Sequence, residues 1–122
     1  MPAYNFSPEF ANDVQHRRKR STIRMSDKNA KVGDTVYLYT GQRTKQCRSL
    51  GTSTLVALET ISLHEKHVIF GGFTLRANSL LDLLARADGF KDYPDMTAWF
   101  KSKYKIDSLD TAPIRGYLHA WS

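Results

Sequence analysis

VIFGGFTL, residues 68–75, is the strongest structural signal in the sequence. Each arm combines aromatic and aliphatic residues of the kind that favour strands, and two glycines separate the arms. Only glycine adopts both positive-φ positions of a two-residue turn at little energetic cost. We therefore predict a tight β-hairpin at this point in the chain.

Strands are also predicted on the N-terminal side of the hairpin. Residues 52–63 form a long apolar and β-branched segment, and residues 35–40 (TVYLYT) alternate so that Val36 and Leu38 share one face. The short β-branched segment 21–24 predicts a strand entry. The hairpin therefore extends an existing set of strands.

Helices are predicted on both sides of these strands. Ser7-Pro8-Glu9 is typical of a helix start and predicts a helix over about 8–17. Asn78 is a candidate cap for a leucine-rich helix that Gly89 ends, and Asp92 is a candidate cap for another helix.

A closing strand is predicted over 114–121. The resulting order of one helix, several strands, two helices and a strand has no regular βαβ alternation. It indicates an α+β fold, a small mixed β-barrel with helices packed outside it.

Length and composition limit the class of protein. A chain of 122 residues that is 41% hydrophobic and 25% charged predicts one globular, soluble domain spanning 1–122, which we expect to be a monomer. No apolar run is long enough to cross a membrane, and no leader segment is recognisable. Cys47 is the only cysteine, so we expect a reducing, cytoplasmic setting.

Positive charge is concentrated in one part of the chain. The 18 Lys and Arg residues exceed the 12 Asp and Glu residues, and the excess falls mainly within residues 16–48. A block of this kind fits a polyanionic or nucleotide partner. A solvated surface that keeps the protein in solution explains it equally well, so charge alone decides nothing.

A lysine and a threonine within this block stand out. Lys19 and Thr22 lie three residues apart at a predicted helix-to-strand junction, where their side chains can converge. A lysine held neutral can take the proton of a hydroxyl and so create a nucleophile. Four neighbouring cations should lower the pKa of Lys19: Arg17, Arg18, Arg20 and Arg24. The alternative is a set of ordinary basic surface residues.

Other familiar sites are absent or weak in the sequence. There is no glycine-rich phosphate loop and no Gly-x-Ser-x-Gly motif. His64-Glu65-Lys66-His67 offers two histidines beside the hairpin, but no third metal ligand is close in sequence, so we expect turn histidines and no metal. We expect Cys47 to be an incidental cysteine. No cofactor is predicted.

Three motifs in order resemble one known family. KRSTIR (19–24) has the form Lys-x-x-Thr-Ile-Arg, Val32-Gly33-Asp34 leads into a strand, and Ala87-Asp88-Gly89-Phe90 follows the leucine-rich helix. Together they resemble the ASCH domain family of PUA-like β-barrels, over nearly the whole chain.

The resemblance implies two kinds of function. Small members of the family include amidohydrolases that remove the acyl group from N(4)-acetylcytidine. In that branch Lys19 matches the base and Thr22 the nucleophile. Asp88 matches the proton donor, although the enzymes have glutamate there, so Glu59 is an alternative acid. Other members resemble RNA-binding or RNA-processing modules, which implies a nucleic-acid groove or a ribonuclease.

Three further residues are candidates for contacts with an acylated cytidine nucleoside or a modified RNA. Arg24 is placed to stabilise an oxyanion. Tyr39 can stack on a pyrimidine, unless it packs under a helix instead. Arg43 follows the same predicted strand and can hold a phosphate or a base carbonyl.

Overall fold

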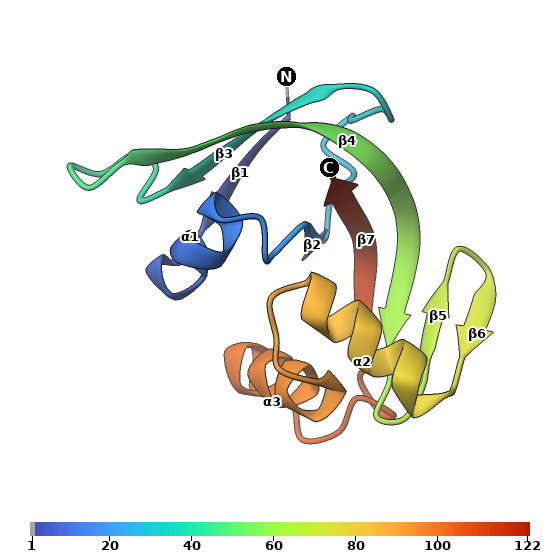
Figure 1. The fold of residues 1–122 in the computed structure, drawn as a ribbon. Coiled ribbons are helices and arrows are strands. Elements are labelled where there is room, and N and C mark those ends of the chain that lie inside the picture. The colour runs from blue at the N-terminus through green and yellow to red at the C-terminus, as the bar shows by residue number, and fades with distance from the viewer. Residues whose placement is uncertain (1) are drawn as a thin grey trace.

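The longest element of the fold is β4 (Arg48–Leu63), a bent strand that belongs to both halves of the sheet (Figure 1). The structure, a computed structural model, describes residues 2–122. The first part of β4 pairs with β3 (Thr35–Thr40), and the second part pairs with β7 (Ile114–Trp121). Its last residues also pair with β5 (Val68–Phe70), so β4 connects every part of the sheet.

Three shorter strands complete a seven-stranded sheet. The strand β1 (Ala3–Phe6) runs parallel to β3, and β2 (Ser21–Arg24) runs antiparallel to β7. The strand β6 (Phe73–Leu75) forms the predicted hairpin with β5 around the two glycines. The hairpin and the α+β class are therefore confirmed.

The described residues do not form a closed barrel. The strands β1 and β2 each pair on one side only and are not joined by a ladder. The Arg24 side chain lies between them instead, and its Nη2 donates a hydrogen bond to the Asn5 carbonyl oxygen at 2.9 Å. The small β-barrel expected from the sequence is therefore not closed in the described residues.

Irregular pairing accompanies the bend of β4. The β3–β4 register shifts between Leu38 and Tyr39, opposite Gly51, which has a φ of +111° that favours glycine. A second shift occurs between Leu55 and Ala57. These two irregularities let one strand turn from the first half of the sheet into the second.

Three helices pack against the sheet. The helix α1 (Pro8–Gln15) follows β1, whereas α2 (Asn78–Ala87) and α3 (Tyr93–Tyr104) lie together near the end of β4 (Figure 1). Asp92 caps α3 as predicted, since its carboxylate accepts a hydrogen bond from the Asp95 amide. Ala77, rather than Asn78, occupies the cap position of α2.

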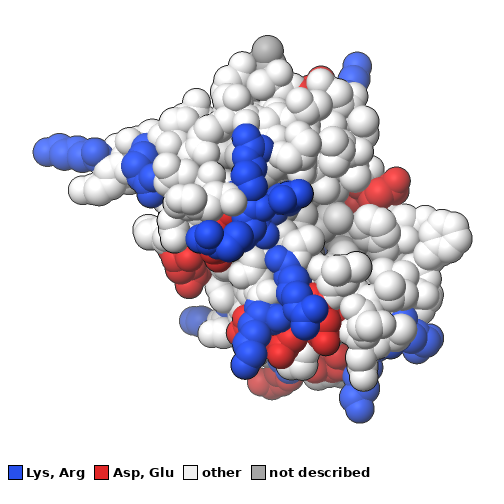
Figure 2. Space-filling view, viewed as in Figure 1, with Lys and Arg blue, Asp and Glu red and all other residues white. Residues whose placement is uncertain are grey.

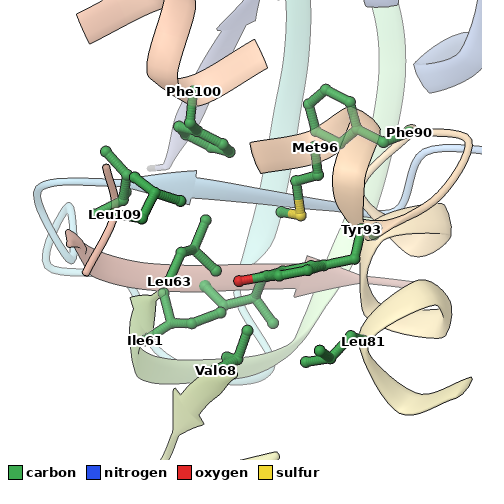
Figure 3. Packing of buried hydrophobic residues seen from close by; sticks show 12 residues of the cluster. Ile61, Leu63, Val68, Leu81, Phe90, Tyr93, Met96, Phe100 and Leu109 are labelled. Atoms are coloured by element: carbon green, nitrogen blue, oxygen red, sulfur yellow. The ribbon is translucent and has the colours of Figure 1, made fainter. Parts of the chain in front are cut away.

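The buried apolar residues form two clusters, one in each half of the sheet. Figure 3 shows the cluster under α2 and α3, where Tyr93 and Met96 face Leu63 and Val68. The other cluster joins β1, α1 and β3, and it includes Tyr4, Val14, Val36, Leu38 and Trp121. Because β4 contributes to both clusters, it holds the two halves together.

No helix within residues 2–122 has both the length and the apolar character needed to cross a lipid bilayer.

Candidate active site

A cavity of about 280 Å³ lies between the open edges of β1 and β2. Its lining includes three of the predicted catalytic residues, Lys19, Thr22 and Asp88, together with Arg24. The structure therefore brings residues of the first motif (19–24) and of the last motif (87–90) into one cavity. The open edge of the sheet is what leaves room for the cavity.

Backbone hydrogen bonds fix the segment that carries Lys19. The chain leaves α1 through Arg17, which adopts a left-handed conformation with φ of 64°. The amides of Arg18 and Lys19 then donate to the Asp13 carbonyl oxygen at 2.9 and 3.0 Å. The Arg20 amide donates to the Ala87 carbonyl oxygen at 2.8 Å, so the segment is held between α1 and the end of α2.

Gly89 allows the Lys19 side chain to pack closely against the end of α2. A Cβ atom at Gly89 would lie 3.0 Å from Lys19 Cδ and 3.3 Å from its Cβ and Cγ. The φ of Gly89 is also +93°, which disfavours other residues. The glycine of the Asp88-Gly89-Phe90 motif therefore makes room for the lysine stem.

The Lys19 amine is buried and contacts Asp88 twice. Its side chain is 4% exposed, and Nζ donates to the Asp88 carbonyl oxygen at 2.5 Å. The same Nζ lies 3.3 Å from Asp88 Oδ1. Nζ also lies 5.0 Å from the ring centre of Phe10, with the rings of Phe6 and Phe90 slightly farther away.

Burial shifts both members of this pair toward their uncharged forms. It lowers the pKa of Lys19, while Asp88 opposes this effect and Arg24 adds to it. Burial raises the pKa of Asp88, while Lys19 and the Ser21 hydroxyl oppose that effect. The ionised form of the pair, an ammonium and a carboxylate, carries the same number of protons as the uncharged form, an amine and a carboxylic acid. Transfer of one proton between Lys19 and Asp88 therefore converts one form into the other.

The predicted cause of the Lys19 shift is wrong for three of the four arginines. Arg17 donates to the Thr52 carbonyl oxygen and to Ser53 Oγ, and Arg18 pairs with Asp13 at 2.7 Å. Arg20 Nε donates to the Arg17 carbonyl oxygen. Only Arg24 contributes to lowering the pKa of Lys19, and burial is the larger cause.

Thr22 and Arg24 lie on the same face of β2, two residues apart. Arg24 Nε donates to Thr22 Oγ1 at 3.0 Å, so the hydroxyl oxygen is held by a cation. Ser21 faces the other way, and its hydroxyl donates to Asp88 Oδ1 at 2.9 Å. Among the described residues, Lys19 and Thr22 share no direct hydrogen bond, although both line the cavity.

Aromatic rings form the apolar part of the cavity wall. Phe10 packs edge-on against Phe90 and Trp99, at centroid distances of 5.6 and 5.4 Å. Trp99 also lines the cavity, which the sequence could not show, because helical spacing does not distinguish a core residue from a cavity residue. Phe90 was detectable, since it belongs to the Asp88-Gly89-Phe90 motif.

Three other predicted residues lie away from the cavity. Tyr39 is on β3, where it pairs with Asn5 and Ser49, and Arg43 is in the exposed turn that follows. Glu59 is exposed on β4, with its carboxylate beside the Gly71 turn. Tyr39, Arg43 and Glu59 are therefore not among the residues that line the cavity with Lys19, and Asp88 is the acid beside the lysine.

Comparisons of this chain with protein-family models, with curated proteins and with solved structures found no match.

Proposed function

We propose that this protein is a metal-independent amidohydrolase that removes the acyl group from N(4)-acetylcytidine or a related N(4)-acylated cytosine nucleoside. The observation that carries the proposal is the buried Lys19–Asp88 contact, which shares a cavity with the Thr22 hydroxyl. The resemblance of the Lys-x-x-Thr-Ile-Arg segment to the ASCH amidohydrolases supplies the substrate class. Membership of that family is part of the proposal.

The reaction begins from the uncharged form of the Lys19–Asp88 pair. Neutral Lys19 accepts the Thr22 hydroxyl proton, and Thr22 Oγ1 forms a bond with the carbonyl carbon of the substrate amide. The carbonyl electron pair moves onto oxygen and creates an oxyanion. Arg24 stabilises this charge, and such preorganised donors are typically worth about 3 kcal/mol.

Asp88 completes the first half of the reaction. Its carboxylic acid protonates the exocyclic nitrogen as the carbon–nitrogen bond breaks, so the cytosine nucleoside leaves and an acyl-Thr22 ester remains. Lys19 is now protonated and Asp88 ionised. A proton returns from Lys19 Nζ to Asp88 Oδ1 across their 3.3 Å contact and restores the uncharged pair.

Water completes the second half. Neutral Lys19 accepts a proton from water, and the resulting hydroxide attacks the ester carbonyl. When the second tetrahedral intermediate collapses, Thr22 leaves as an alkoxide and regains the proton from Lys19. The carboxylic acid product leaves, and every catalytic group is back in its starting form.

The cavity wall suits a flat heteroaromatic ring. Phe10, Phe90 and Trp99 offer ring faces and edges, and the cation of Arg24 lines the same cavity. Arg24 Nη1 has no hydrogen-bond partner among residues 2–122, so it can donate to a substrate oxygen.

The direct test uses the purified protein and N(4)-acetylcytidine, with deacylation followed by the change in ultraviolet absorption. We expect turnover in wild type and a loss of about a thousandfold or more in Thr22→Val, which keeps the branched shape but lacks the hydroxyl. Thr22→Ser should retain measurable turnover. His16→Gln, at an exposed position outside the cavity, is the matched control and should behave as wild type.

Two further measurements distinguish this mechanism from one that needs a metal ion or one without an acyl-Thr22 intermediate. Addition of a chelator should leave turnover unchanged. Mass spectrometry after rapid acid quenching should detect an acyl group on Thr22. Failure of wild type to hydrolyse any N(4)-acylcytosine nucleoside would contradict the proposed function, and full activity of Thr22→Val would contradict the nucleophile.

A second candidate function is binding of RNA without catalysis. Figure 2 shows Lys and Arg side chains gathered on the face that carries the end of α1, where Arg17, Arg18 and Arg20 are exposed. If these cations hold phosphates, Arg18→Gln and Arg20→Gln should each weaken RNA binding and lower the salt slope by about one unit. Replacement of the buried Lys19 by Met should then change RNA affinity little.

A further inference from the structure

The turn between β4 and β5 presents two histidines on one face. The His64 amide donates to the His67 carbonyl oxygen at 3.0 Å, which closes the turn and places the two residues opposite each other. Their rings are stacked, with centroids 4.2 Å apart and an angle of 9° between the planes. The two imidazoles are therefore arranged as neighbours before any ligand binds.

Asp110, from the loop that precedes β7, joins the two histidines. One donor atom from each of His64, His67 and Asp110 lies within 4.8 Å of the other two. The sequence did not reveal this third residue, because it is distant along the chain. The fold therefore adds the third candidate metal ligand that the His64-Glu65-Lys66-His67 segment lacks.

Hydrogen bonds tie together the two segments that carry these residues. The Glu65 amide donates to Asp110 Oδ1 at 3.2 Å, and the Leu109 amide donates to Glu65 Oε2 at 2.6 Å. The Tyr93 hydroxyl donates to the His64 carbonyl oxygen at 2.5 Å. The Leu109–Glu65 and Tyr93–His64 hydrogen bonds hold the two segments without using the three candidate ligand side chains.

We propose that His64, His67 and Asp110 bind a divalent transition-metal ion, with Zn²⁺ as the best match. Imidazole nitrogens and a carboxylate oxygen are ligands that zinc accepts, and three protein ligands leave one position for water or a small molecule. The site is separate from the Lys19 cavity, so this proposal does not depend on the amidohydrolase function.

The three side chains have to move to reach the geometry of a zinc site. Bonds of about 2.0 Å to a tetrahedral ion separate neighbouring donor atoms by roughly 3.3 Å. The donors, now within 4.8 Å of one another, have to close by up to about 1.5 Å. The two imidazole rings also have to tilt out of their parallel stack, because lone pairs that lie in parallel ring planes do not converge on one ion.

The surroundings of His64 also suit a metal ligand. Its Nε2 lies 2.8 Å from Ser62 Oγ, so Nε2–H can donate to the hydroxyl while Nδ1 keeps a free lone pair. Histidine ligands commonly donate their other nitrogen in this way. His64 also lines an open groove of about 590 Å³ together with Arg115 and Tyr117, into which the fourth coordination position can face. Among the described residues that line this groove, Arg115 is the one arginine or lysine, and it would attract an anionic fourth ligand.

The test is a Co²⁺ titration of protein that carries no histidine tag, in a Cys47→Ser background. Cys47 is exposed and would otherwise compete for the ion. We expect one equivalent of Co²⁺ to produce the visible bands of a tetrahedral site, and Zn²⁺ to remove them. His67→Phe keeps a ring in the stack without a donor nitrogen and should weaken binding by about 100-fold or more.

Asp110→Asn is the companion variant. It keeps an oxygen acceptor for the Glu65 amide but loses the negative charge, and we expect binding to weaken by about 10- to 100-fold. Zn²⁺ should raise the melting temperature of the unsubstituted site and leave that of His67→Phe unchanged. Because Asp110→Asn alters one exposed side chain, it tests the site even where His67→Phe is poorly folded.

His16→Phe is the matched control, since it removes an exposed histidine from another part of the molecule. It should bind Co²⁺ like the unsubstituted site. The proposal is overturned by absence of saturable binding at millimolar Co²⁺. Unchanged affinity in both His67→Phe and Asp110→Asn, or an equal loss in His16→Phe, would also overturn it.

Discussion

At the scale of single residues, the chemistry of the site depends on one shared proton. The contacts of Lys19 Nζ with Asp88 keep an acid and a base side by side, and burial works against charge on either one. The proposed reaction needs the amine neutral and the acid protonated. The pair therefore acts as a unit, and its two apparent pKa values belong to the pair.

The pH dependence of catalysis should follow from these shifts. Turnover falls at low pH as Lys19 gains a proton and at high pH as Asp88 loses one, which gives a bell-shaped profile. Arg24 lowers the pKa of both groups, so its removal raises both values. We therefore expect Arg24→Gln to move the whole profile to higher pH, whatever its effect on the maximum rate.

Arg20→Gln is the control for this prediction, because it removes one positive charge from the surface without a contact to Lys19. Its profile should coincide with that of wild type. A shift of the Arg24→Gln profile to lower pH, or an equal shift in Arg20→Gln, would contradict the assignment of the two groups.

Part of this site was predictable from the sequence. The Lys19–Thr22 spacing and the Asp88-Gly89-Phe90 motif identified residues that do share a cavity. The cause of the Lys19 shift was not predictable, because burial arises from Phe10 and Phe90, which are far apart in the sequence. The local sequence instead suggested that neighbouring arginines lower the pKa of Lys19, but three of them make their contacts elsewhere.

At the scale of elements, the accuracy of prediction follows the range of the interactions. The hairpin at 68–75, the strand at 35–40 and the closing strand at 114–121 depend on local patterns and were all predicted. The strand β1 was missed, because its four residues pair in parallel with β3, which is distant in sequence. The start of β4 was missed as well, since a polar segment containing Gly51 has the composition of a loop.

The junction after α2 allows a matched test of how Lys19 is positioned. Gly89→Ala forces an unfavourable φ and brings a methyl group within 3.0 Å of Lys19 Cδ. Gly72→Ala forces a similar φ, of +88°, but its methyl group meets nothing within 4 Å. We expect each change to lower the free energy of unfolding by about 1–3 kcal/mol, as measured by urea denaturation.

Only Gly89→Ala should also reduce turnover of N(4)-acetylcytidine, because only that change displaces the lysine stem. Equal activity losses in the two variants would show that backbone strain, and not contact with Lys19, is responsible.

At the scale of the whole molecule, the long strands β4 and β7 both contribute to the two cores. Leu55 belongs to the cluster with Trp121, and Leu63 belongs to the cluster under α2 and α3. The α+β class was predictable from the order of elements. The opening between β1 and β2 was not, because closure of a barrel depends on whether two distant edges meet.

The two cores should unfold together. Leu55→Ala and Leu63→Ala each remove a fully buried side chain, and each should cost about 2–5 kcal/mol of unfolding free energy. Single-tryptophan variants provide one probe for each core: Trp99→Phe leaves Trp121, and Trp121→Phe leaves Trp99. We expect their fluorescence transitions in urea to coincide with loss of circular dichroism. Separate midpoints for the two tryptophans would show that β4 does not couple the cores.

Burial should keep the Lys19 amine neutral and so allow it to act as a base, and an NMR titration measures this directly. In protein labelled with ¹³C at lysine Cε, the Lys19 signal can be assigned by its loss in Lys19→Met. We predict that this signal titrates below the ordinary pKa of a lysine side chain, which is about 10.4. A Lys19 titration at or above the ordinary pKa of lysine would contradict this role for Lys19.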